Sequence, residues 1–188
     1  MTSYLRANEI AKKPVVTLAG NDLGQVKDIV FDASTGSIRL FTLAGRGLLA
    51  GPLHQVLPWG NVHALGPDAV MVRDESALED ESADLSGASQ PGSGNVLGLA
   101  VTTRGGTRLG TVTDAVVESG RTPVVAGYEV ETGEHRRVLL PVAGPVTVSD
   151  ERVLVPDATA GHSAGDISGF GAAARSLREH LPGESKED

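Results

Sequence analysis

Two stretches of this chain, 86 residues apart, carry the same pattern of residues. The first copy contains Val15, Thr17, Gly20, Leu23, Gly24, Val26, Asp28 and Val30, and the second contains Val101, Thr103, Gly106, Leu109, Gly110, Val112, Asp114 and Val116. After a net loss of three residues the match resumes, and Leu57-Pro58 returns as Leu140-Pro141. A repeat of this length exceeds the period of a solenoid, so the sequence predicts two copies of one small domain.

Composition narrows what these domains can be. Hydrophobic residues make up 40% of the 188 residues but aromatic residues only 3%, so aliphatic side chains must supply most of the core. The net charge of −8 divides evenly, with −4 in residues 1–94 and −4 in residues 95–188, which makes a nucleic-acid partner unlikely. The chain has no cysteine, which excludes disulfides and thiolate metal sites.

The start of the chain lacks the pattern of a signal peptide, and no window has the length of apolar sequence that spans a membrane. We therefore expect a cytoplasmic protein without a membrane span. The abundance of Arg, Ala, Gly and Val suggests a bacterial source of high GC content.

Short strands joined by turns of Gly, Pro, Asn and Asp predict an all-β fold of two tandem small antiparallel β-barrels. The first barrel is expected over residues 1–74 and the second over 95–156. Residues 75–94 are acidic and rich in Ser, Gly and Ala, which is typical of a flexible linker. Residues 157–188 are expected to hold a linker, a short α-helix from about Phe170 to Leu181 with Ser168 as a possible cap, and a charged tail.

The repeated motif resembles the PRC-barrel family, the small β-barrel of the photosynthetic reaction-centre H subunit and of ribosome-maturation factor M. The residues that carry the resemblance are Leu23, Gly24, Val26, Asp28, Pro58 and Trp59 in the first copy, and Leu109, Gly110, Asp114 and Pro141 in the second. The second copy has Val142 where the first has Trp59. The resemblance covers residues 5–73 strongly and residues 96–156 less strongly.

The resemblance implies an adaptor, because family members bind a protein or ribonucleoprotein partner and share no catalytic residues. We therefore expect no enzyme activity and no cofactor. The identity of the protein partner is not implied, and a homo-oligomer is an alternative.

The residues themselves favour the same interpretation. Asp28 and Asp114 could form a pair of catalytic carboxylates, but a carboxylate that accepts backbone N–H bonds in a strand or turn is the better explanation. The five histidines lack the spacing of a metal site, so no metal is expected. Gly105–Gly110 favours a hairpin turn over a phosphate loop. Trp59 is more typical of a buried plug at a barrel end than of an exposed binding anchor.

Two apolar features are not required by the repeat. Leu48, Leu49 and Leu53 lie in a glycine-rich loop that would normally be polar, and Phe170, Leu177 and Leu181 form one stripe on the predicted helix. Each feature either folds back onto its own barrel or forms part of a partner or self-association surface. Both alternatives remain open at this point.

A second hypothesis is RNA or ribosome binding through the second repeat. Its candidate residues are Arg104 and Arg108 in one turn and Arg136 and Arg137 in another. Affinity gained from phosphates would fall with added salt.

Overall fold

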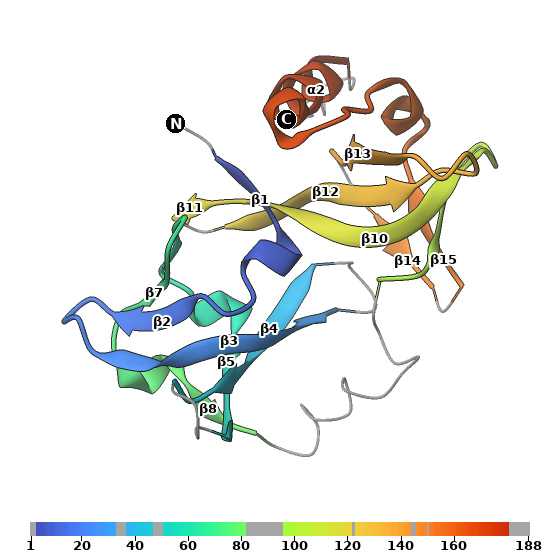
Figure 1. Cartoon of the computed structure of the whole chain (residues 1–188). Coiled ribbons are helices and arrows are strands. Elements are labelled where there is room, and N and C mark those ends of the chain that lie inside the picture. Colours follow the sequence, from blue (N-terminus) through green and yellow to red (C-terminus); the bar gives the residue numbers. More distant parts are fainter. Residues whose placement is uncertain are drawn as a thin grey trace, which may run out of the picture.

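The computed structural model is mostly β, with one helix at its C-terminal end (Figure 1). It describes residues 3–32, 37–46, 51–81, 96–121, 123–143, 146–149 and 151–180, so Leu48, Leu49 and Leu181 lie outside the described residues. No helix within these ranges is long and apolar enough to cross a membrane.

The first repeat forms a sheet in the strand order β11-β6-β7-β2-β3-β4-β5-β8. Its own elements are β2 (Pro14–Thr17), β3 (Asp22–Phe31), β4 (Ile38–Ala44), β5 (Pro52–Pro58), η2 (Trp59–Asn61), β6 (Ala64–Leu65), β7 (Val70–Val72), η3 (Glu75–Ala77) and β8 (Glu79–Asp80). All neighbours are antiparallel except β2 and β7, which run parallel with Val15 opposite Val70.

The second repeat forms a sheet in the order β13-β12-β10-β9-β15-β14, with β1 added on β10. Its elements are β9 (Ala100–Thr103), β10 (Arg108–Glu118), β11 (Gly120–Arg121), β12 (Val124–Glu131), β13 (Arg137–Pro141), β14 (Thr147–Val148), β15 (Arg152–Val155), η5 (Asp157–Gly161) and α2 (Ile167–His180). The N-terminal segment contributes β1 (Tyr4–Arg6) and η1 (Ala7–Glu9). In the described residues each sheet is an open row of strands and not a closed barrel.

The duplication extends to individual hydrogen bonds. The N–H of Thr17 donates to the carbonyl of Asn21 at 2.9 Å, and the N–H of Thr103 donates to that of Thr107 at 2.8 Å. The parallel pair of β2 and β7 recurs as β9 and β15, with Val101 opposite Val153. The predicted repeat is therefore a repeat of structure.

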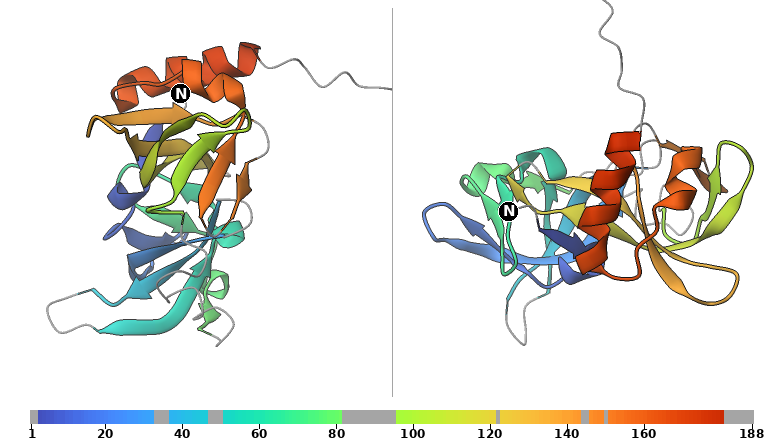
Figure 2. Two further views of the ribbon diagram at one scale, coloured as in Figure 1. Left: turned by 90° about the vertical axis from the view of Figure 1, so that its right-hand side faces the viewer. Right: turned by 90° about the horizontal axis from the view of Figure 1, so that it is seen from above.

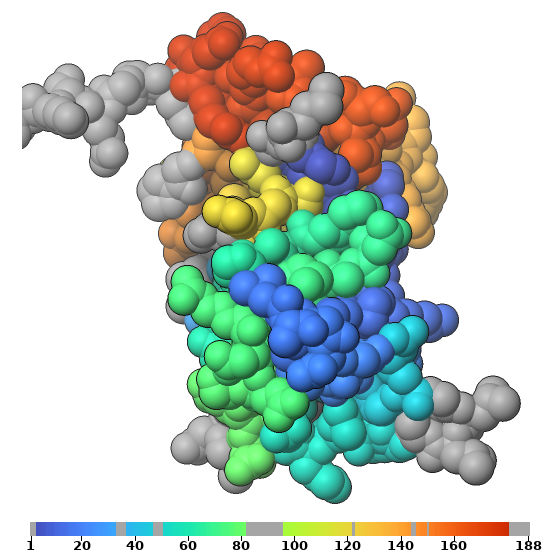
Figure 3. Space-filling model, turned by 90° about the vertical axis from the view of Figure 1, so that its left-hand side faces the viewer, coloured from blue at the N-terminus to red at the C-terminus, as the bar shows by residue number. Residues whose placement is uncertain are grey.

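The two repeats are joined by an exchange of strands. β1 precedes the first repeat but pairs with β10 of the second, with Arg6 opposite Val116. In return β11 of the second repeat pairs with β6 of the first, with Gly120 opposite Leu65. Figure 3 shows the surface of the second repeat near residue 120, in yellow, against the green surface of the first.

The buried side chains form one continuous main core that draws on both repeats, including Ile10 and Phe41 from the first and Val96 and Val112 from the second. As the composition requires, it is largely aliphatic. Trp59 is half-buried at its margin and packs edge to face on Phe41, with ring centroids 5.6 Å apart.

Helix α2 covers the outer face of the second sheet (Figure 2). Its buried stripe of Phe170, Ala174 and Leu177 lies where the spacing predicts. The helix begins earlier than expected, because the carboxylate of Asp166, not Ser168, accepts the N–H of Gly169 at 2.7 Å and caps the first turn. Phe170 lies over Gly127, where a Cβ would come within 2.9 Å of its ring.

The Leu-Gly step of the motif marks a close approach between backbones. Gly24 has φ +129°, and a Cβ built there would lie 2.7 Å from the carbonyl oxygen of Ala44. Gly110 has φ +155° and meets the carbonyl of Glu131 in the same way. Only glycine combines this conformation with this contact.

We therefore expect Gly24→Val to lower the free energy of unfolding by about 2 kcal/mol or more through strain and overpacking. Gly51→Val is the matched control, because its Cβ would meet no atom within 4 Å and its φ is not positive. Chemical denaturation of both variants measures the difference. Equal stability of the two variants would contradict the structural role of the motif.

Candidate interaction surfaces

The hairpin of β4 and β5 projects from the first repeat (Figure 2, left). Leu53 follows the last strand pair before the connecting loop, is half-buried and packs against the core, close to Gly24. Arg46 forms an ion pair with Asp22 near the same end of the hairpin. Leu53 therefore closes part of its own repeat, whereas the chain between Arg46 and Gly51, which carries Leu48 and Leu49, lies outside the described residues.

The stripe of helix α2 is covered by the chain itself. Phe170 and Leu177 are fully buried, and Phe170 packs on Val116, Ala126 and Leu139 of the second sheet. Tyr4 of β1 adds an edge-to-face contact with Phe170, with centroids 5.0 Å apart. Both residues are thus covered within the chain, Phe170 by the second sheet.

The four candidate arginines of the RNA hypothesis lie in two turns at one end of the second sheet. Arg104 and Arg108 flank the β9–β10 turn, and Arg136 and Arg137 follow the β12–β13 turn. Acidic groups accompany them, because Arg136 lies 2.7 Å from Glu134 and Arg137 lies 3.6 Å from Glu129. The turns are thus mixed in charge.

Two buried carboxylates, Asp114 and Glu129, lie opposite each other in the second sheet, and the repeated motif contains only Asp114. Asp114 of β10 is 6% exposed, and Glu129, opposite it on β12, is 5% exposed. Arg6 donates to Glu129 at 2.6 Å, and the hydroxyl of Thr113 donates to it at 2.9 Å. The backbone N–H groups of Ala115 and Asn8 donate to Asp114 at 2.8 and 3.3 Å, as expected for a structural carboxylate.

These surroundings shift the two pKa values in opposite directions. Burial opposes the ionisation of Glu129, but the hydrogen bonds of Arg6 and Thr113 and the charges of Arg6 and Arg137 outweigh it and lower the pKa of Glu129. Burial raises the pKa of Asp114, and the N–H groups of Ala115 and Asn8 offset this only in part. Both carboxylates are engaged by the protein's own donors, which favours a structural role over acid–base chemistry.

The matching carboxylate of the first repeat has another environment. Asp28 is 66% exposed and lies 3.8 Å from Lys27. Its backbone N–H donates to the hydroxyl of Thr42, the residue that faces Asp28 as Glu129 faces Asp114. The repeated Asp is therefore buried in one copy and solvated in the other.

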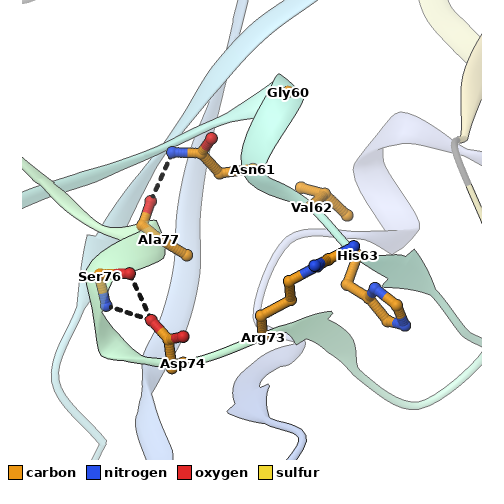
Figure 4. Close-up of a pocket in the computed structure, with 8 residues that line it drawn as sticks. All are labelled: Gly60, Asn61, Val62, His63, Arg73, Asp74, Ser76 and Ala77. Atoms are coloured by element: carbon orange, nitrogen blue, oxygen red, sulfur yellow. Dashed lines mark hydrogen bonds between the residues drawn. The ribbon is translucent and has the colours of Figure 1, made fainter.

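An open hollow of about 470 Å³ lies between η2 and η3 of the first repeat (Figure 4). The side-chain amide of Asn61 donates to the carbonyl of Ala77 at 2.9 Å, and Asp74 accepts the N–H of Ser76 at 2.9 Å. Figure 4 shows the His63 ring turned away from Asp74. Within the described ranges no group of three His, Cys, Asp or Glu residues could hold a metal ion.

The pair of Arg6 and Glu129 generates the first prediction for this cluster. Arg6→Ala removes the shortest donor of a buried carboxylate, so we expect a loss of about 2 kcal/mol in the free energy of unfolding. Arg136→Ala removes an exposed ion pair and should cost at most about 0.5 kcal/mol. Denaturant unfolding of both variants tests this, and equal losses would count against the cluster.

The lowered pKa of Glu129 also predicts a pH dependence. A carboxyl whose pKa is lower in the folded state stabilises the fold above its ordinary pKa, and this contribution disappears as the pH falls through the folded value. The stability difference between the native chain and Glu129→Gln should be constant above about pH 5 and shrink below it. Denaturant unfolding of the native chain and of Glu129→Gln, measured from pH 7 to pH 3, gives the stability difference at each pH. The exposed Glu134→Gln is the control. A difference that does not change with pH would contradict the assignment.

Comparison with known proteins agrees with the repeated architecture. The family model described as PRC-barrel domain matches residues 3–78 and again residues 92–161. The chain is also 34% identical over 71 residues to a probable sporulation protein, YlmC, of Bacillus subtilis (strain 168), over 35% of this chain and 88% of that protein. The two matches of the family model cover most of the chain, which therefore belongs to the PRC-barrel domain family.

Proposed function

We propose that this chain is a non-catalytic adaptor that binds a protein partner through tandem PRC barrels, in which each open sheet corresponds to one barrel of the family. The proposal rests on the hydrogen-bond partners of the buried carboxylates. The most buried carboxylates, Asp114 and Glu129, are engaged by the protein's own donors, and in the described part of the chain no cluster offers a metal site.

The projecting β4–β5 hairpin is the proposed contact. It carries Leu48, Leu49 and Leu53, whereas the matching connection in the second repeat, Glu131–Arg137, is shorter and charged. Leu53 packs against the core of its own repeat, so Leu48 and Leu49 would make the contact with the partner. We leave Phe170 and Leu177 out of this proposed surface, because both are buried residues of α2.

The setting of the adaptor is part of the same proposal. We propose a bacterial and cytoplasmic protein, and the abundance of Arg, Ala, Gly and Val supports the bacterial source. The Bacillus relative is named a probable sporulation protein, and sporulation is therefore the first process in which we would look for the partner.

The alternative function is RNA or ribosome binding by the second repeat. It is supported by the placement of Arg104, Arg108, Arg136 and Arg137 at one end of the sheet. It predicts an affinity for RNA that falls steeply with added salt. No binding at low salt would remove it.

Replacement of both Leu48 and Leu49 by Ser tests the adaptor. We expect the double variant to lose capture of the partner from a lysate of the native host while its melting temperature is unchanged, because a contact residue need not stabilise the fold. Leu18→Ser is the control, since Leu18 is 57% exposed on another turn of the same repeat.

Sedimentation of each variant is measured alongside, because the same loop could join two copies of the chain. A lowered melting temperature with capture intact would mean that these leucines only cover the core.

A further inference from the structure

We propose that the surface between the two repeats also binds a second copy of this chain, by exchange of whole repeats between two molecules. In the exchanged dimer the first repeat of each molecule packs against the second repeat of the other. This inference does not depend on the proposed adaptor function.

The first set of contacts joins the N-terminal segment to the second repeat. β1 extends the sheet along β10, with Tyr4 opposite Glu118, and the hydroxyl and N–H of Ser119 both donate to the carbonyl of Ser3 at 2.8 Å. Arg6 brings a positive charge to the buried Glu129. The contact is thus complementary in backbone pairing and in charge, as a specific interface requires.

The second set of contacts runs in the opposite direction. β11 leaves the second repeat and extends the first sheet, with Arg121 opposite Ala64. The main core continues between the repeats, so each repeat buries apolar surface against the other. The N-terminal and β11 contacts together hold each repeat to the other, and neither involves residues 82–95.

Residues 82–95 are the covalent connection between the repeats, and they comprise fourteen residues of chain. The contacts are made by residues on either side of this connection, so they can form equally well between two molecules. The connection sets the effective concentration of one repeat near the other, which favours the monomer when the protein is dilute. The Bacillus relative, matched over 71 residues that make up 88% of it, has the length of one repeat.

The pair of Arg6 and Glu129 offers a direct test with two full-length variants. Arg6→Glu places two acids together within one molecule, and Glu129→Arg places two arginines together. Each variant alone should be monomeric with a lowered melting temperature. When both are refolded together from denaturant, exchange restores the opposite charges at both interfaces, so we expect a species of twice the monomer mass and a higher melting temperature. A mixture that sediments and melts as the sum of its two components would overturn the proposal.

Two controls keep the test decisive. The chain with both substitutions restores the pair within one molecule and should remain monomeric, which shows that the reversed pair is tolerated. Where the reversed pair is not tolerated, deletion of residues 84–93 from the native chain decides instead, because a shorter connection disfavours pairing within the molecule. We expect this variant to keep its β-sheet circular dichroism and double its mass, and a folded monomer would contradict the exchange.

Discussion

The burial of Asp114 and Glu129 beneath the N-terminal segment is the constraint that organises this molecule. A carboxylate removed from water is costly unless donors replace the water. Thr113 and Ala115 supply two of those donors from the second repeat, and Arg6 and Asn8 supply two more from β1 and η1, which precede the first repeat in sequence. The N-terminus is therefore held where the carboxylates need it, and the two repeats are held together with it.

The same constraint explains how two copies of one unit came to differ. The second repeat pairs β1 with its strand β10 and packs α2 on the face that carries Val116 and Leu139. The first repeat leaves Asp28 in solvent and extends the β4–β5 hairpin outward. The buried polar cluster and the helix are therefore features of the second repeat, and the projecting hairpin is a feature of the first.

The local features of the fold could be predicted from the sequence because they depend on neighbours along the chain. The turns at Gly20 and Gly106, the close approach at Gly24 and Gly110, and the spacing of the helix stripe are of this kind. Glu129 and Arg6 could not be found in this way, because 123 residues separate them and Glu129 matches Thr42 in the other copy.

Comparison of backbone conformation reveals a further match that residue identity conceals. Lys12 has φ +71° and its counterpart Gly98 has φ +87°, and the N–H of each donates at 2.8 Å, to Val26 and Val112 respectively. The repeated turn conformation is kept although only the second copy has a glycine at this position. The exchange of β1 and β11 was equally hidden, because strand partners distant in sequence leave no local pattern.

The contact of Phe170 with Gly127 distinguishes the second repeat from the first. Gly127 lies opposite Val116, whereas the corresponding position opposite Val30 in the first repeat is occupied by Leu40. A helix that followed the first repeat would meet a leucine where the aromatic ring of Phe170 now lies. A Cβ at residue 127 would also meet the carbonyl oxygen of Leu140, so the glycine of the second repeat is required by its own sheet as well as by the ring of Phe170.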